Sequence, residues 1–173
     1  MKKLFIVVDA QKDFVTGSLG SEIADHKIPR IEKEIENLDK DDALIFTFDT
    51  HNEDYLETFE GKRLPVEHCI KGTDGWNLDE RLQRHIERAN YLIEKPTFGF
   101  LEWKNIVDEI NPDEIHICGF CTDICVISNA LILRAIYPGK KIVCRRPLCA
   151  GTTKVAHNAA IKVMLSCQID VEG

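Results

Sequence analysis

The chain has 173 residues, of which 44% are hydrophobic and 29% are charged, a composition that excludes a disordered chain. A prior of about 150 residues per domain predicts a single domain over residues 1–173. The formal net charge is −7, from 22 Lys and Arg against 29 Asp and Glu, and no basic cluster is long enough to follow a phosphate backbone. Nucleic acid is therefore a poor partner.

The lack of a recognisable targeting signal and the pattern of cysteines both indicate the cytoplasm. No apolar run approaches the roughly 20 residues of a membrane span, and the first apolar run, residues 4–8, is too short for a signal peptide. We predict a cytoplasmic protein that does not bind membranes. The 7 cysteines are an odd number without the even framework of a small secreted scaffold, so reduced thiols are expected.

Short apolar runs alternate along the chain with longer stretches of helical period. Such alternation predicts a Rossmann-like α/β fold, a three-layer, doubly wound parallel sheet of about six strands with helices on both faces. Between residues 49 and 76 no clear element is expected, and long segments of this kind are usually functional or disordered. Strands are expected at 4–8, 43–48, 91–94, 114–118, 141–144 and 167–171, and helices at 27–38, 78–88, 101–110, 123–137 and 153–165.

Reactive side chains follow three of the expected strands. Asp9 follows the first, Lys95 follows the third, and Cys125 lies at the start of the helix after the fourth. Ligands of open α/β sheets bind outside the carboxyl ends of the strands, so these residues can converge there. We expect the helix N-terminus and Lys95 to hold Cys125 as a thiolate, while Asp9 takes its proton and delivers it to a leaving amine. Taken singly, each residue has a structural interpretation as a cap, a solvated lysine or a buried thiol.

A second group of polar side chains follows the second strand. Asp49 and His51 come directly after it, and Glu60 and His68 come later in the same segment. Carboxylate and imidazole together suit zinc, iron or manganese. Spacing alone leaves a capping aspartate and two surface histidines as the alternative.

These residues belong to a series of motifs that resembles the isochorismatase-like cysteine hydrolases, and among them the nicotinamidases. The resemblance runs in order over nearly the whole chain, and the last motif is the most specific. The motifs are Asp9-x-Gln11-x-Asp13-Phe14, Asp49-x-His51, Leu64-Pro65-Val66-Glu67-His68-Cys69, Glu94-Lys95 and Gly119-x-x-Thr122-Asp123-x-Cys125-Val126.

The resemblance implies a mechanism. Asp9, Lys95 and Cys125 would form a catalytic triad that hydrolyses a small carboxamide such as nicotinamide through a thioester. It further implies a cis peptide bond at Phe120–Cys121 and an oxyanion hole made by the N–H groups of Cys121 and Cys125. Because isochorismatases proper cleave a vinyl ether without a cysteine, Cys125 argues against that activity.

The resemblance also implies a cofactor and a ring pocket. One divalent ion, with zinc preferred over manganese or iron, would be held by Asp49, His51 and His68, with Glu60 as a candidate fourth ligand. Phe14 matches one aromatic wall of the ring pocket, and Phe98 is a candidate for a second. Relatives commonly assemble, so a homo-oligomer is expected.

The chain departs from the nicotinamidase pattern in one loop. It has Leu64 and an extra residue before His68, where nicotinamidases usually have an aromatic residue and a shorter ending. The alternative substrate is therefore another small amide, cleaved by a different C–N hydrolase of the same family.

Two other classes of function stay open. Cys118-Gly119-Phe120-Cys121 is a C-x-x-C between a strand and a helix, as in thioredoxin-like redox proteins, and predicts reversible closure of Cys118–Cys121. The second class is a binding protein that kept the fold and lost the activity. Three thiols, at Cys118, Cys121 and Cys125, make a thin case for an iron–sulfur site because a fourth partner is missing.

Overall fold

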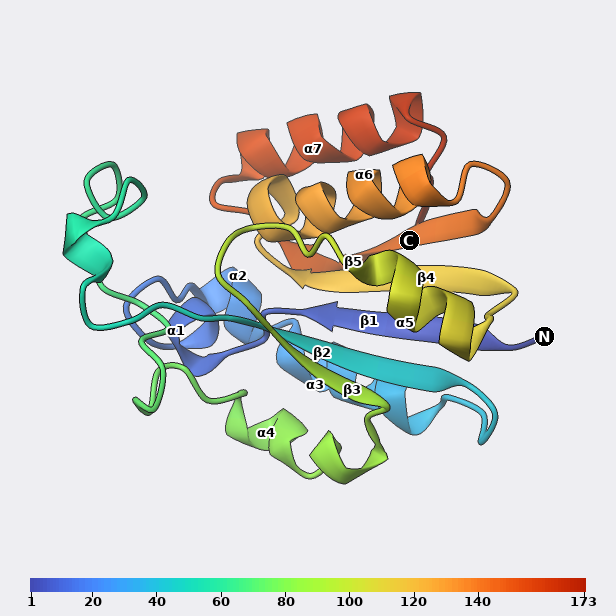
Figure 1. Cartoon of the computed structure of the whole chain (residues 1–173), viewed down its shortest axis with the longest axis horizontal. Helices are drawn as coiled ribbons and strands as arrows, with labels where there is room; N and C mark the ends of the chain where they lie inside the picture. The colour runs from blue at the N-terminus through green and yellow to red at the C-terminus, as the bar shows by residue number, and fades with distance from the viewer.

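A computed structural model describes residues 1–173 and contains one sheet of six strands. All neighbouring strands are parallel, and their order is β3-β2-β1-β4-β5-β6 (Figure 1). The predicted doubly wound parallel sheet is confirmed. The strands are Lys3–Val8 (β1), Ala43–Asp49 (β2), Tyr91–Lys95 (β3), Glu114–Phe120 (β4), Lys141–Ala150 (β5) and Asp170–Glu172 (β6).

Helices cover both faces of the sheet. On one face α3 (Ile28–Glu36) packs against α4 (Glu80–Gln83), and on the other α6 (Ile127–Ile136) packs against both α5 (Trp103–Ile110) and α7 (Lys154–Ser166) (Figure 1). None of these helices has the length and apolar character that crossing a membrane requires.

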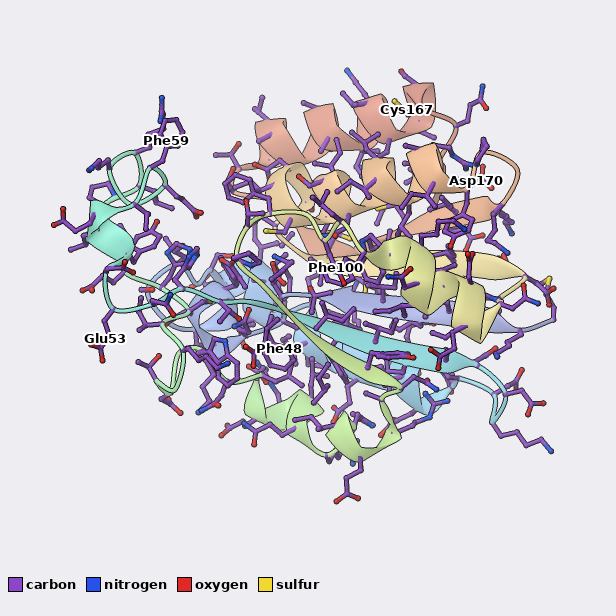
Figure 2. All side chains as sticks on the ribbon, in the orientation of Figure 1. Phe48, Glu53, Phe59, Phe100, Cys167 and Asp170 are labelled. Carbon is purple, nitrogen blue, oxygen red and sulfur yellow. The ribbon has the colours of Figure 1, made fainter.

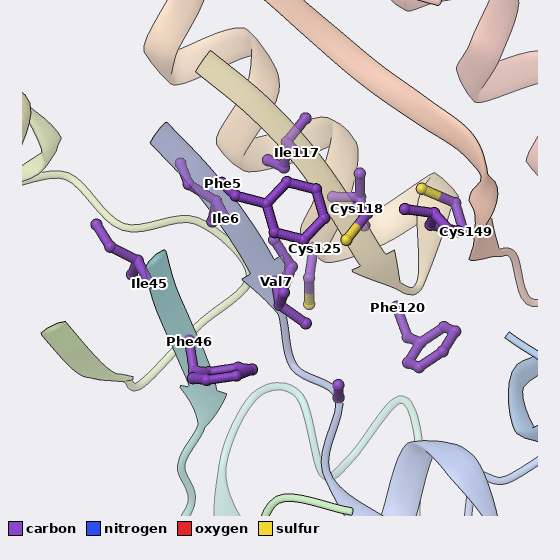
Figure 3. Close-up of a cluster of buried hydrophobic side chains, with 14 of the residues drawn as sticks. Phe5, Ile6, Val7, Ile45, Phe46, Ile117, Cys118, Phe120, Cys125 and Cys149 are labelled. Carbon is purple, nitrogen blue, oxygen red and sulfur yellow. The ribbon is translucent and has the colours of Figure 1, made fainter. Parts of the chain in front are cut away.

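The central strands are mostly apolar because both of their sides are covered, although β4 also buries Glu114 and His116. Every residue of β2 and β4 is buried, as are the last five residues of β1. Figure 3 shows side chains of these three strands, Phe5, Phe46 and Ile117 among them, in one cluster. Burial on both faces removes the polar alternation of a half-exposed strand, which is why short apolar runs located the strands in the sequence.

The helices differ from the prediction where hydrogen bonding changes. The prediction of one helix over residues 78–88 is wrong, because the chain forms α4 and then a separate 3₁₀ turn, η2 (Ile86–Arg88). Between them the His85 N–H donates to the Leu82 carbonyl, a tighter bond than that of an α-helix. Two short helices after β1, α1 (Lys12–Val15) and α2 (Glu22–Asp25), were not expected, since four residues show no helical period.

Further boundaries differ from the prediction, and the largest difference is in the fifth strand, which was expected to end at residue 144 and runs to Ala150. The expected helix over residues 123–137 begins as a π-helical turn, η3 (Thr122–Val126), and becomes α-helical only at α6. The expected last strand starts three residues late, at Asp170, because α7 continues to Ser166 and Gln168 then takes a left-handed conformation with φ of 62°.

The strand order reverses between β1 and β4, and the carboxyl ends of these strands therefore flank a crevice. The segment over residues 50–76 contains only one 3₁₀ turn, η1 (Tyr55–Glu57), and extends outward from that same edge of the sheet (Figure 1). Figure 2 shows Phe59 at the outer end of this segment, and its side chain is 74% exposed. The crevice and this segment together provide the residues of the candidate site.

Candidate active site

The carboxylate of Asp9 stands directly beyond β1. The backbone of Asp9 has a positive φ of 49°, and its N–H donates to the Thr47 carbonyl (3.1 Å). The Asp9 Oδ1 accepts from the Thr47 hydroxyl (2.6 Å). The ammonium of Lys95, the last residue of β3, lies 2.5 Å from Asp9 Oδ2. Both side chains are fully buried. The structure thus joins two of the predicted triad residues in an ion pair closed off from water.

Burial and charge act in opposite directions on this pair. Burial raises the pKa of Asp9 above its ordinary value, and the nearby Lys95 only partly offsets that effect. Burial alone would lower the pKa of Lys95, but Asp9, Cys125 and Asp49 surround the ammonium and raise it above its ordinary value. The raised pKa of Lys95 favours its charged form. The raised pKa of Asp9 means that its carboxylate accepts a proton more readily than an ordinary aspartate does.

Cys125 lies in the π-helical turn η3 and is 3% exposed. Burial raises the pKa of its thiol well above the ordinary value, the Asp9 carboxylate adds to that rise, and Lys95 opposes it more weakly. These effects favour a neutral thiol in the free protein over the expected thiolate. Asp9 is the neighbouring carboxylate that can remove its proton when a carbonyl is attacked.

A cavity of about 890 Å³ opens in front of Cys125. The predicted residues Cys121, Phe14 and Phe98 also line it, whereas Asp9 and Lys95 do not reach its wall. The peptide bond Phe120–Cys121 is cis, as the resemblance implied. Of the three predicted triad residues, only Cys125 therefore lines the cavity.

The four predicted metal ligands come together in the same cavity. Asp49 ends β2, and His51, Glu60 and His68 reach it from the segment that follows. Their ligand atoms all lie within 4.8 Å of one another. Asp49 Oδ2 is 3.1 Å from His51 Nε2 and 3.4 Å from His68 Nε2, and Glu60 Oε1 is 3.7 Å from His68 Nε2. Three of the four residues are buried, and Glu60 is half-buried.

The hydrogen bonds of the cluster suit a cation. His68 Nδ1 lies 2.8 Å from the Val66 carbonyl, which can only accept, so Nδ1 carries a hydrogen and Nε2 is the nitrogen that would bind a metal ion after losing its own proton. Buried Asp49 Oδ1 has no hydrogen-bond partner. Burial alone would raise the pKa of Asp49, but bonds from His51 and His68 hold it below its ordinary value. Two imidazoles and two carboxylates with an unpartnered oxygen fit a divalent metal ion.

Several residues that support the site were not identified from the sequence. Gln11 is fully buried, and its amide donates to the Asp49 carbonyl (2.9 Å) and accepts from the Asp49 N–H (2.8 Å). Asp13 Oδ2 accepts from the Cys69 N–H (2.8 Å), next to His68. Gln11 and Asp13 lie in the motif that begins at Asp9, so their position in the motif was the available signal.

Tyr55 was also missed. Its side chain is fully buried, with its ring centroid 4.7 Å from that of His51 and 4.9 Å from that of His68. Its hydroxyl donates to the Leu64 carbonyl (2.9 Å). Tyr55 therefore ties the two imidazoles to the loop that also carries Glu60. A single tyrosine in a polar segment shows no periodicity, so the sequence offered no signal for this role.

The redox interpretation gains no support from the positions of the cysteines. Cys118 is fully buried within β4, in the same cluster as Cys149 (Figure 3), whereas Cys121 is partly exposed at the cavity wall. All seven cysteines are unpaired. Cys144 and Cys149 have their sulfurs 4.0 Å apart, but both are buried and neither lines the cavity.

The fold and the cavity at its switch point are those of an α/β enzyme of the isochorismatase type. The chain belongs to the isochorismatase family, since the isochorismatase domain model matches residues 3–172. It is 30% identical over 174 residues to an isochorismatase family protein, PncA, of Bacillus subtilis, with 93% of each chain covered. It is 28% identical over 204 residues to a nicotinamidase of Schizosaccharomyces pombe, covering 96% of this chain and 90% of the relative.

Solved structures agree with that assignment. The pyrazinamidase of Pyrococcus horikoshii in complex with zinc is 25% identical, with a TM-score of 0.80 and 98% of each chain covered. The nicotinamidase PncA of Bacillus subtilis is 28% identical, with a TM-score of 0.80 and 100% of each chain covered.

Proposed function

We propose that the chain, residues 1–173, acts as a single cysteine-dependent amidohydrolase domain that releases ammonia from a small pyridine-type carboxamide such as nicotinamide. The observation that carries the proposal is the buried Asp9–Lys95 pair, 2.5 Å apart, behind a cysteine that faces a cavity also lined by four metal-type ligands. The nicotinamidase and pyrazinamidase relatives, similar over nearly the whole chain, support the same substrate class.

The chain's own groups can perform each step of the proposed reaction. Asp9 takes the proton of the Cys125 thiol as its sulfur attacks the amide carbon, and the N–H groups of Cys121 and Cys125 face the developing oxyanion. Asp9 then delivers the proton to the amine, and ammonia leaves with the C–N bond broken. Asp9 takes a proton from the water that attacks the thioester, which yields the acid and restores the thiol. Lys95 keeps a positive charge beside Asp9 throughout.

The ring of the substrate would lie between the aromatic walls. Phe14 and Phe98 both line the cavity, and stacking on such walls favours a planar aromatic amide. The metal fits the cluster of Asp49, His51, His68 and Glu60, and when bound it supplies a Lewis acid for a ring nitrogen. Zinc is the first choice, manganese and iron are alternatives, and assembly of several copies stays a prediction.

Metal removal is expected to weaken substrate binding more than it slows the chemistry. Since the proposed ion holds the ring and not the scissile amide, stripping it should raise the KM for nicotinamide by on the order of tenfold with a smaller change in kcat. Ammonia release from nicotinamide, pyrazinamide and acyclic amides is measured after chelation and after adding back zinc, manganese or iron. Turnover of acyclic amides alone would favour another C–N hydrolase, and no turnover at all would contradict the proposal.

The buried Gln11 amide is expected to set metal affinity. β1 has already ended where β2 reaches Asp49, and the Gln11 side chain bonds both the N–H and the carbonyl of Asp49 in place of a neighbouring strand. Gln11→Leu should therefore weaken zinc binding about 10- to 100-fold, the range for residues that support metal ligands. Competition with a chromophoric chelator measures the affinity.

A matched control isolates that effect. Gln83→Leu removes an exposed glutamine whose amide bonds the Leu78 carbonyl (3.0 Å) and forms no hydrogen bond with Asp49 or the other metal-type ligands, so it should leave zinc affinity unchanged. Equal affinities of the Gln11 and Gln83 variants would show that Gln11 does not support Asp49.

A further inference from the structure

Asn129 is a completely buried amide one helical turn after Cys125, on α6. Its Nδ2 donates to the carbonyls of Cys125 (2.8 Å) and Phe98 (3.1 Å). Its Oδ1 accepts from the Phe100 N–H (2.9 Å) and the indole N–H of Trp103 (2.9 Å). An asparagine amide has two N–H donors and two acceptor positions, so each one is used. A buried amide that is fully bonded in this way is held in one orientation.

These bonds hold the segment of residues 96–101, which connects β3 to α5 (Figure 1). The segment lies outside the helices and strands and forms no backbone–backbone hydrogen bond of its own. The two bonds from Asn129, at the Phe98 carbonyl and the Phe100 N–H, replace them. Figure 2 shows Phe100 beside the start of α5, where its ring packs edge-on against Trp103 at 5.2 Å.

Pro96, Thr97 and Phe98 of this segment line the cavity. Two groups of the segment bear directly on the proposed chemistry: the Phe98 ring forms a wall, and the Thr97 carbonyl accepts from Lys95 Nζ (3.2 Å). Lys95 also has its closer partner in Asp9, so its position does not depend on the segment. Phe98 has no such second anchor, and its side chain is 40% exposed. Of the two groups, the aromatic wall is therefore the one that Asn129 controls.

We propose that Asn129 is a positioning residue that fixes the Phe98 ring relative to the sulfur of Cys125, and so determines how well the site accepts an aromatic ring without changing the reactivity of the thiol. The inference rests on the proposed function in naming Phe98 as a wall of the ring pocket. Asn129 itself touches no substrate, because its amide is enclosed by the four protein groups that it bonds.

The test compares two electrophiles that alkylate Cys125. Iodoacetamide carries no ring, whereas 3-(bromoacetyl)pyridine presents a pyridine ring beside its reactive carbon. Rates at Cys125 are measured by peptide mass spectrometry on the intact protein and divided by the rate of each reagent with a free thiol. This ratio needs no turnover, so it is obtained even if nicotinamide is not a substrate, and ammonia release by the wild-type protein tests the proposed function separately.

The variant Asn129→Thr is chosen because a helical threonine hydroxyl can still bond the carbonyl four residues before it, that of Cys125, while the bonds to Phe98, Phe100 and Trp103 are lost. We expect the preference of Cys125 for the pyridine reagent to fall about fivefold, the size of an aromatic contact. The iodoacetamide rate should stay within about twofold of wild type, since the turn that carries Cys125 keeps its bond.

A double-mutant cycle separates positioning from a general structural effect. Phe98→Ala should lower the same preference, and adding Asn129→Thr to it should lower the preference no further, because Asn129 acts through Phe98. If Asn129→Thr fails to fold by circular dichroism, Asn129→Ser replaces it in the cycle.

Three results would overturn the proposal. They are an equal loss of rate with both reagents, additive effects of the two substitutions, and a wild-type protein whose Cys125 shows no preference for the pyridine reagent.

Discussion

Replacing Cys125 with alanine is expected to abolish ammonia release from any amide that the wild-type protein hydrolyses. Cys125 is the only residue of the Asp9–Lys95–Cys125 constellation that lines the cavity, so neither Asp9 nor Lys95 can form the acyl intermediate in its place. Loss of a nucleophile that acts with its base as a unit lowers kcat by several orders of magnitude, and we expect a drop of at least roughly a thousandfold. A coupled ammonia assay with nicotinamide measures it.

The neighbouring thiol provides the control. Cys121→Ala removes a second sulfur from the same cavity wall but keeps the backbone N–H that the proposed oxyanion hole uses. It should retain most of the activity. Full turnover by the Cys125 variant would remove the triad from the mechanism, and equal losses in both variants would show that the effect comes from altered packing of the cavity wall.

The sheet and the triad positions could be predicted because both depend on local sequence. Residues 4–8 and 43–48 are largely apolar runs whose burial on both faces leaves a clear pattern, and Asp9 comes directly after the first of them. Lys95 follows the run of residues 91–94, which is only partly buried. A residue that follows a parallel strand is brought to the ligand-binding edge by topology alone. The predicted positions of the strands were therefore sufficient to predict that the reactive groups lie close together.

The supporting residues could not be predicted because their roles depend on tertiary contacts. Asn129 lies on an ordinary helix, and only the folded chain brings Phe98 and Trp103 to its amide. The surroundings of the Cys125 thiol could not be predicted for the same reason. In the sequence, a helix N-terminus and a lysine favour a thiolate at Cys125. Burial opposes the charged form of the thiol, and its extent is known only from the folded structure.

Removing the positive charge of Lys95 is expected to have the largest effect on stability. The ammonium is fully buried and lies 2.5 Å from the equally buried carboxylate of Asp9. Lys95→Met fills a similar volume but leaves the carboxylate without its cation, and breaking a buried pair in this way costs about 3–5 kcal/mol of unfolding free energy. Urea denaturation, with the midpoint and slope compared to wild type, measures the change.

The double variant Asp9→Asn with Lys95→Met shows whether an unpaired charge is the cause. Because neither residue is then charged, most of the lost stability should return, while ammonia release stays absent since no group is left to take the Cys125 proton. Recovery of stability without activity would separate the two roles of the pair. It would show that the buried charges of Asp9 and Lys95 are needed for proton transfer and not for stability. A double variant as unstable as Lys95→Met alone would instead mean that packing around the lysine side chain, and not its charge, holds this edge of the sheet together.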